Sequence, residues 1–266
     1  MANGAPGGAL REIAKWAAEQ VLWRRVTLQH VVEQRSARPR RKPVAVDPTD
    51  VLGTRADWER ACRQLRELRL PLHRDKPKNW DALAALSLVL ENVEPTGAVL
   101  DAGCARYSTL LPSLRLYGFT DLFGNNLEWS RESHHGPVRL VPGDMTATSF
   151  PDARFDAITC LSVIEHGVPV KGFLVEAARL LKPGGVLFIS TDYDQNPPDT
   201  TGKTAYGQPV HIFSPDEIRA IVSEADAVGF RLIGELKLDH AERPVTWPRV
   251  GIDYTFLSVG LRKAEK

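Results

Sequence analysis

The apolar residues from position 98 onward fall into short continuous runs, and segments with helical spacing separate most of them. Runs of this kind are typical of parallel strands, which are buried on both faces of a sheet. The chain is therefore predicted to have an α/β fold with right-handed crossovers. We expect strands at 98–101, 120–124, 138–141, 155–162, 186–191, 230–236 and 254–261, and helices at 108–116, 127–133, 172–181 and 214–227.

Three further helical segments are predicted upstream, at 9–34, 50–70 and 80–91. The first carries one apolar stripe, with two tryptophans beside it. The stripe consists of Leu10, Ile13, Ala17, Val21, Leu28 and Val31, and the tryptophans are Trp16 and Trp23. We therefore divide the chain into an N-terminal helical extension with a basic linker, residues 1–75, and an α/β domain, residues 76–266.

The charge is balanced overall but unevenly distributed. The net charge of +1 gives no general indication of a nucleic-acid or membrane partner. Residues 1–45, however, hold nine Lys and Arg against three Asp and Glu, whereas the remainder holds 25 against 30. One interpretation of the first helix and its basic linker 35–42 is a foot for a membrane surface or nucleic acid. The alternative, which we favour because the basic run follows the stripe, is docking on its own domain or on a second copy as a homo-oligomer.

The three cysteines, Cys62, Cys104 and Cys160, have no CxxC or metal-ligand spacing. We therefore expect the three thiols to be reduced and buried, and we predict no structural metal. No run approaches the roughly 20 apolar residues of a transmembrane segment. The N-terminus also lacks the apolar core of a signal peptide. We therefore expect a cytoplasmic protein.

The stretch 98–108, AVLDAGCARYS, concentrates the candidate chemistry. An apolar run ends at Asp101, Gly103 and Ala105 follow, and a helix is predicted to begin near Ser108. This pattern predicts a buried strand that opens into a tight turn at a helix N-terminus, the place where α/β folds bind nucleotides. Glycine lets the backbone approach a ligand closely, and Asp101 is expected to fix polar groups there.

Four further motifs follow in order: GNN at 124–126, GDM at 143–145, FDAITCLSVIEH at 155–166 and ARLLKPGGVLF at 178–188. With the first stretch, they resemble the class I S-adenosylmethionine-dependent methyltransferase superfamily, and in particular its methyltransferase type 11 group. The resemblance covers about residues 78–263. It implies a Rossmann-like, seven-stranded sheet with helices on both faces, strand order 3-2-1-4-5-7-6 and an antiparallel last strand.

The resemblance also implies that S-adenosyl-L-methionine is the cofactor and S-adenosyl-L-homocysteine the product. Gly103 and Ala105 would then lie against the methionine part, and Asp101 would organise its ammonium group. Asn126 takes the place of the acidic residue that usually binds the ribose hydroxyls. Ala105 and Tyr107 replace two glycines of the usual motif, which makes the loop less permissive.

Further cofactor contacts follow from the later motifs. Asp144 would accept a hydrogen bond from the adenine amino group, and Met145 would pack on the ring. Leu161 and Ser162 would line the exposed side of the cofactor. Ordinary packing is the alternative role for Met145, Leu161 and Ser162.

The acceptor is less closely defined. His166 and His211 are the candidate bases, and a base is needed only for a hydroxyl or a protonated amine. The segment 191–213 is rich in Asp, Asn, Thr, Tyr and Gln, which favours a small polar molecule or a glycan methylated at oxygen. The alternatives are a catalytically silent binding protein of this fold and an RNA methyltransferase. The acidic balance of residues 46–266 argues against nucleic acid.

Overall fold

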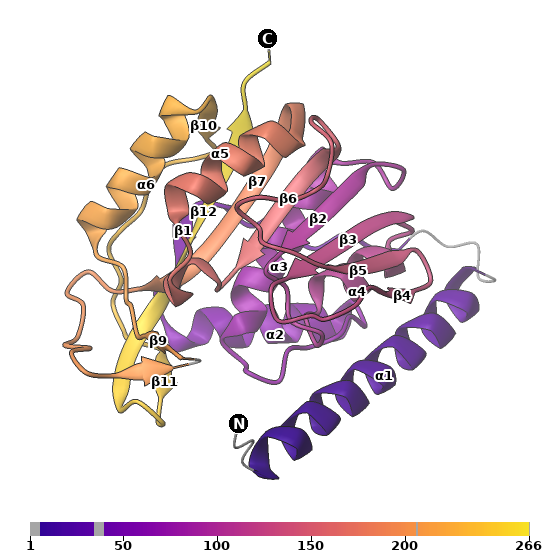
Figure 1. The fold of residues 1–266 in the computed structure, drawn as a ribbon, viewed down its shortest axis with the longest axis horizontal. Coiled ribbons are helices and arrows are strands. Elements are labelled where there is room, and N and C mark those ends of the chain that lie inside the picture. Colours follow the sequence, from indigo (N-terminus) through magenta and orange to yellow (C-terminus); the bar gives the residue numbers. More distant parts are fainter. Residues whose placement is uncertain (1–5, 35–39, 206, 266) are drawn as a thin grey trace.

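The computed structural model describes residues 6–34, 40–205 and 207–265 and is built around one mixed sheet (Figure 1). The sheet has the strand order β1-β12-β7-β6-β2-β3-β5-β4, with β10 and β11 also paired to β12. Its strands are β1 (Asp50–Val51), β2 (Ala98–Ala102), β3 (Asp121–Asn126), β4 (Ser133–His135), β5 (Val138–Pro142), β6 (Phe155–Leu161), β7 (Leu181–Tyr193), β10 (Phe230–Leu232), β11 (Val245–Trp247) and β12 (Ile252–Lys263). A separate small hairpin pairs β8 (Thr204–Ala205) with β9 (Gln208–Pro209).

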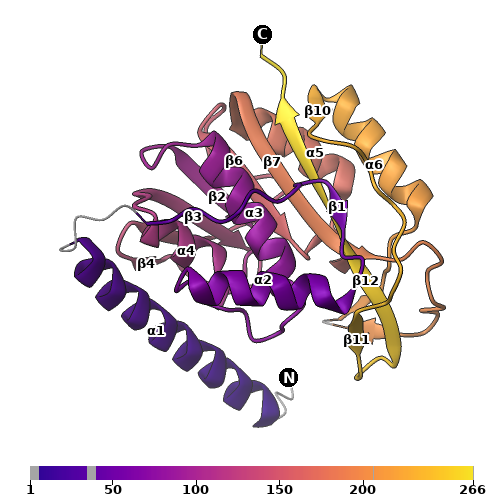
Figure 2. The ribbon, with the colours of Figure 1, turned by 180° about the vertical axis from the view of Figure 1, so that it is seen from behind.

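Helices cover both faces of the sheet. They are α1 (Pro6–Gln34), α2 (Arg55–Glu67), α3 (Lys78–Asn92), α4 (Leu110–Leu116), the 3-10 turn η1 (Ile164–His166), α5 (Val170–Leu180) and α6 (Pro215–Ala227). The helices α5 and α6 lie over the face that is nearer in Figure 1, and α2, α3 and α4 lie over the face that is nearer in Figure 2. The long helix α1 lies outside these layers, alongside α4 and β4.

The order and direction of the strands follow from their pairing. The strands β5, β3, β2, β6 and β7 are parallel, and β12 lies antiparallel between β7 and β10. Numbered as the sequence predicts them, the seven strands have the order 3-2-1-4-5-7-6. The α/β class, with helices on both faces, is confirmed.

Alternation along the central strands explains why they are apolar throughout. In β2, Val99 belongs to the core on the side of α3, whereas Leu100 belongs to the core on the side of α5. Neighbouring residues of a strand point to opposite faces, so a strand that is covered on both sides needs apolar side chains at every position. Burying each large side chain contributes about 1.5–3 kcal/mol.

Several predicted elements need correction. The helix predicted at 127–133 is wrong: a turn follows Asn126, and β4 then pairs antiparallel with β5. The Asn126 Oδ1 accepts a hydrogen bond from the Glu128 N–H at 2.8 Å. This side-chain bond stabilises a turn in place of the first turn of a helix. Residues Asp50–Val51 form a strand on β12 and not the start of a helix. The predicted strand 230–236 ends at Leu232, and the predicted strand 186–191 extends to Tyr193.

The helix α1 docks on its own chain, as the favoured interpretation predicts, but not through the predicted stripe. Its docking face is centred on Glu19, Trp23 and Val26, all of which are buried. Glu19 Oε1 lies 2.7 Å from His135 Nε2, and the ring of Trp23 stacks on that of His135 with centroids 4.8 Å apart. The contact therefore joins α1 to the strand β4.

Candidate active site

Asp101 lies at the carboxyl edge of the sheet, in the centre of the candidate site. It pairs in register with Gly124 on one side and Thr159 on the other. The carboxylate is 1% exposed and accepts hydrogen bonds from Thr159 Oγ1 at 2.8 Å and Ser108 Oγ at 3.0 Å. Burial raises the pKa of Asp101 to about 7, against the effect of these two bonds. Hydroxyl groups alone are weak partners for a buried carboxylate, so this chemistry suits a cationic ligand group.

The turn after Asp101 requires glycine at position 103. Gly103 has φ +72°, and a Cβ there would lie 2.6 Å from Val163 Cγ1. Its N–H donates a hydrogen bond to Asn125 Oδ1 at 3.2 Å. Two independent constraints, backbone conformation and space, therefore exclude a side chain at this position.

Asn126 reaches back to the same turn. Its Nδ2 donates to the carbonyl oxygens of Gly103 at 3.2 Å and Cys104 at 3.0 Å, while its Oδ1 accepts from Glu128 N–H. An amide oxygen has two lone pairs, so Oδ1 retains capacity for one more donor. The side chain thus holds the loop in place and still presents an acceptor at the end of β3.

The rest of the loop contacts the N-terminal extension. The Ala105 carbonyl accepts a hydrogen bond from Ser108 N–H at 2.9 Å. The guanidinium of Arg106 lies 3.4 Å from Glu19 of α1, and the Tyr107 ring lies 5.7 Å from that of His73. Both larger residues therefore point toward the extension, which leaves the small Ala105 between them.

Asp144 and Met145 follow β5 at the same edge. Asp144 Oδ1 accepts hydrogen bonds from the N–H and the hydroxyl of Thr146, each at 2.8 Å. Met145 is buried in the core on the α5 side, beside Phe123 and other apolar side chains. The side chain of Met145 therefore packs in this core directly after Asp144.

The end of β6 is conformationally strained. Ser162 has φ +51°, a left-handed conformation that costs a residue with a side chain about 1–3 kcal/mol and is frequent at functional sites. Its N–H donates to the carbonyl and the hydroxyl of Ser190, at 3.0 and 3.1 Å. Its hydroxyl donates to Asp81 at 3.3 Å, and the half-buried Leu161 precedes it.

Beside Ser162 lies a group of charged residues that the sequence does not bring together. Asp81, Glu165 and Asp192 are buried, and burial raises the pKa of each of these carboxyls. Burial alone would lower the pKa of Lys78, but the carboxylates of Asp192, Glu165 and Asp81 hold it above its usual value. We call these four residues the buried charge cluster. Within α3 the spacing of Lys78 and Asp81 places them on one face, which is the only local signal for the cluster.

Hydroxyl groups complete this cluster. Ser190 Oγ donates to Asp81 Oδ2 at 2.7 Å, and Thr191 Oγ1 donates to Glu165 Oε2 at 3.2 Å. Tyr254 of β12 donates to Asp192, and burial raises the pKa of this phenol. The cluster therefore joins α3, η1 and β7 at the edge where β6 and β7 end, and Tyr254 connects it to β12.

His166 and His211 have different surroundings. Burial and the nearby charge of Lys78 lower the pKa of His166 to about 4, so its imidazole is neutral at pH 7. Gly167 follows, against Gln208 of the β8–β9 hairpin. His211 Nε2 lies 3.0 Å from Glu217 Oε1, the residue that forms the capping box of α6 with Ser214. The structure thus places His166 beside the buried charge cluster and gives His211 a partner in the α6 cap.

The connection from β10 to β12, residues 233–251, is held to the end of β7 by side-chain hydrogen bonds. Arg243 Nε and Nη2 donate to the two oxygens of the buried Asp194, at 2.6 and 2.9 Å. Tyr193 Oη also donates to the Leu238 carbonyl at 2.7 Å. These bonds fix the connection against the last residue of β7 and the residue that follows it.

Together these features define an α/β protein with a ligand site at the carboxyl ends of its parallel strands. Residues 100–189 match the family model for the methyltransferase domain. This match to a methyltransferase domain agrees with the class I S-adenosylmethionine-dependent methyltransferase superfamily that the motifs predict.

Individual relatives match over parts of their length. The chain is 31% identical over 112 residues to a sterol 24-C-methyltransferase of Gibberella zeae, covering 37% of this chain and 29% of the relative. It is 33% identical over 132 residues to a ubiquinone biosynthesis O-methyltransferase of Xanthomonas oryzae pv. oryzae, covering 46% of this chain and 52% of the relative. The chain spans less than half the length of the sterol methyltransferases it matches.

A solved structure shares the fold. The crystal structure of the [4+2]-cyclase SpnF superposes with a TM-score of 0.51 at 18% identity, covering 70% of this chain and 83% of that one. Since a fold hosts more than one reaction, this likeness supports the architecture and not a particular chemistry.

Proposed function

We propose that this protein transfers a methyl group from S-adenosyl-L-methionine to an acceptor and releases S-adenosyl-L-homocysteine. The observation that carries the proposal is Asp101, a buried carboxylate with hydroxyl partners at the strand edge beside the Gly103 turn. An ammonium group such as that of the cofactor's methionine part matches its charge. The match of residues 100–189 to the methyltransferase domain and the similarity to two methyltransferases support the same reaction.

In this proposal, the motif residues bind the cofactor as the resemblance implies. Asp101 binds the ammonium group, and the Gly103–Ala105 backbone lies against the methionine part. Asn126 accepts from a ribose hydroxyl through the remaining lone pair of Oδ1. When bound, the cofactor supplies a methyl group already activated on a sulfonium, so the protein mainly positions and desolvates the reactants.

The remaining proposed contacts lie on neighbouring strands. Asp144 accepts from the adenine amino group, and Met145 backs the ring from the core. Leu161 and the strained Ser162 border the side of the cofactor where the acceptor enters. The Ser162 conformation fixes this border, because its N–H and hydroxyl are held by Ser190 and Asp81.

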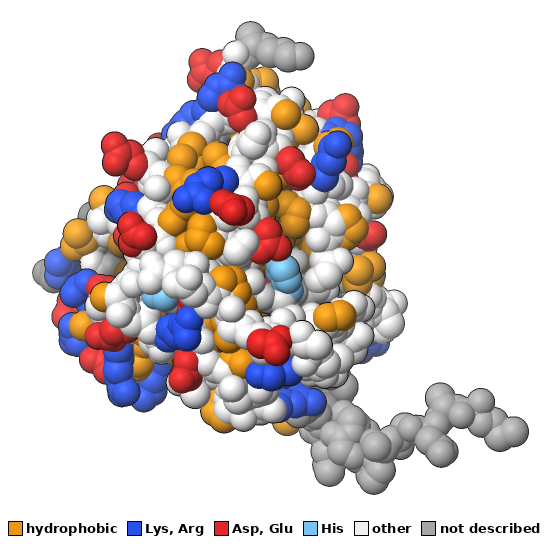
Figure 3. Space-filling model, turned by 90° about the vertical axis from the view of Figure 1, so that its left-hand side faces the viewer, with side chains coloured by type: hydrophobic (Ala, Val, Ile, Leu, Met, Phe, Trp, Pro, Cys, Tyr) orange, Lys and Arg blue, Asp and Glu red, His pale blue; other side chains and the backbone are white. Residues whose placement is uncertain are grey.

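We propose a small polar molecule or a glycan as the acceptor, methylated at oxygen. The buried charge cluster and Tyr254 offer ionic and hydrogen-bonding groups to a hydroxylated acceptor, and His166 is a neutral base beside them. The side of the molecule that carries α6 supports this choice over nucleic acid: acidic and basic side chains are interspersed there, without one broad basic surface (Figure 3).

The experiment is a measurement of S-adenosylhomocysteine release from S-adenosylmethionine with panels of phenols, sugars and sterols. The proposal expects release with hydroxylated polar acceptors and loss of release in Asp192→Asn at unchanged cofactor binding. Methylation of a sterol carbon with no reaction at hydroxyl groups would contradict the proposed acceptor while leaving the methyl transfer intact.

A further inference from the structure

The outward face of α1 is an apolar surface that no other element in the described part of the chain covers. Six of the ten large hydrophobic side chains that are exposed in the described part of the chain lie on this one helix. They are Ile13, Trp16, Val21, Leu28, Val31 and Val32. Four of these side chains are at least 60% exposed: Ile13 60%, Val21 68%, Leu28 69% and Val32 67%. We call this set the α1 stripe. Single exposed hydrophobic residues are ordinary, but several of them on one face of a helix mark an interaction site.

The α1 stripe is held outward by the docking of the opposite face. Glu19, which is 1% exposed, bonds His135 and lies 3.4 Å from Arg106, and Trp23 stacks on His135. Further along, Arg115 Nη1 donates to Thr27 Oγ1 at 3.0 Å. Turning the helix to bury the stripe would break these bonds, so the stripe stays available to a partner outside the chain.

The charges around the stripe identify the kind of partner. Arg24 and Arg25 are both exposed. The only acids between residues 13 and 33 are Glu19, which is buried, and Glu33, which bonds Arg40 and Gln29. A second copy paired through this face would therefore set arginines against an apolar surface that offers no carboxylate.

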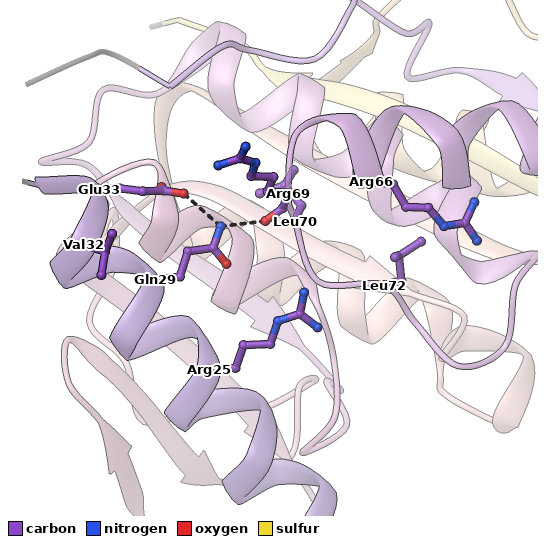
Figure 4. Close-up of a pocket in the computed structure, with 8 residues that line it drawn as sticks. All are labelled: Arg25, Gln29, Val32, Glu33, Arg66, Arg69, Leu70 and Leu72. Atoms are coloured by element: carbon purple, nitrogen blue, oxygen red, sulfur yellow. Dashed lines mark hydrogen bonds between the residues drawn. The ribbon is translucent and has the colours of Figure 1, made fainter. Parts of the chain in front are cut away.

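A basic hollow adjoins the stripe between α1 and the end of α2 (Figure 4). It has a volume of about 350 Å³, and its lining includes three arginines, Arg25, Arg66 and Arg69, and the apolar Val32 and Leu72. The one acid in the lining, Glu33, is paired with Arg40. The ion pairs of the described residues include none of these three arginines. Guanidinium groups beside exposed apolar side chains match lipid phosphates next to acyl chains.

We infer that the α1 stripe and its basic flank bind the surface of an anionic lipid bilayer. None of the helices in the described ranges is long and apolar enough to cross a membrane, so the inferred mode is a helix lying in the interface. Apolar residues and a tryptophan then enter the boundary between head groups and acyl chains, while Arg24, Arg25 and Arg66 contact phosphates. Because Glu19 bonds Arg106 of the candidate cofactor loop, the bilayer would lie beside the active site.

The test is flotation of the full-length protein with vesicles of phosphatidylcholine alone and of phosphatidylcholine mixed in equal parts with phosphatidylglycerol. We expect binding to the mixed vesicles, weakened by salt, and about a tenfold loss of binding in Leu28→Glu. The matched control is Val175→Glu, the same kind of change at an exposed apolar residue of α5, which should bind as the wild type does. No cofactor is needed, so the outcome is independent of the proposed reaction.

Three results would overturn the inference: no binding to the anionic vesicles, equal binding by Leu28→Glu, or a solution dimer that Leu28→Glu dissociates. The last, measured by light scattering without lipid, would assign the stripe to a second copy. Quenching by brominated lipids gives a direct readout, since Trp16 is 58% exposed on the stripe. Trp16→Phe should remove most of this quenching, and unchanged quenching would contradict insertion of α1.

Discussion

At the scale of single residues, Gly103 is the position where both the backbone conformation and the lack of space require glycine. Gly103→Ala should lower the free energy of unfolding by more than the roughly 1–2 kcal/mol of left-handed strain, because the new Cβ meets Val163. It should also weaken S-adenosylhomocysteine binding. The control is Gly118→Ala, which has φ +90° but no atom within 4 Å of the added Cβ. Equal effects of the two changes on urea unfolding and on binding would contradict the role given to Gly103.

His166 is the residue proposed to accept a proton from the acceptor. His166→Gln should lower turnover by about 10²–10⁴-fold, the usual contribution of a positioned base, while leaving cofactor affinity unchanged. With a pKa lowered to about 4, the base stays neutral down to acidic pH, so turnover should not fall between pH 8 and about pH 5 through this group. His211→Gln, whose partner is Glu217, is the comparison variant. Steady-state kinetics that show equal turnover for His166→Gln and the wild type would assign His166 to structure.

At the scale of elements, the contact between α1 and the cofactor loop depends on one buried acid. Glu19→Gln keeps a hydrogen-bonding group but removes the charge that faces Arg106 and His135. We expect the free energy of docking of α1 to weaken by about 1–3 kcal/mol. Hydrogen exchange should then be faster in α1 and in residues 104–107. Glu33→Gln on the same helix is the control and should leave residues 104–107 unchanged. Unaltered exchange in both variants would show that α1 does not support the loop.

The elements also show how far sequence predicts this structure. The parallel strands and the turn at Asp101 were predictable, because doubly covered strands are apolar throughout and the motifs are local. The turn after Asn126 was not, since a side-chain bond to Glu128 overrides the local helical pattern. Which side of α1 docks depends on Glu19 meeting His135, a residue 116 positions away, and spacing along a helix cannot reveal that contact.

The candidate site divides in the same way. On the cofactor side, each proposed residue lies at the end of a strand and within a local sequence motif. These residues are Asp101, Asn126 and Asp144. The buried charge cluster draws residues from α3, η1 and β7, so it exists only after the chain folds. In the sequence, Lys78, Asp81 and Glu165 give no signal beyond their places in a predicted helix or a motif.

At the scale of the whole molecule, buried carboxyls govern the dependence of stability on pH. Burial raises the pKa of Asp81, Asp101, Glu165 and Asp192, so the folded state keeps protons that the unfolded state has lost. The free energy of unfolding should therefore fall as pH rises from about 4 toward 7. In urea titrations, Asp101→Asn should make this fall shallower by up to about 1.4 kcal/mol per pH unit. A slope that is the same in the variant and the wild type would contradict the raised pKa of Asp101.

The most direct test of the account is calorimetric titration of the protein with S-adenosylhomocysteine, in two buffers that differ in ionisation enthalpy. If the ammonium group binds Asp101, whose pKa is raised to about 7, binding should release a proton near or below pH 7 and strengthen as pH rises toward 7. Asp101→Asn should bind more weakly and without that proton release. Absence of binding, or the same affinity and proton balance in Asp101→Asn, would contradict a cofactor site at this strand edge.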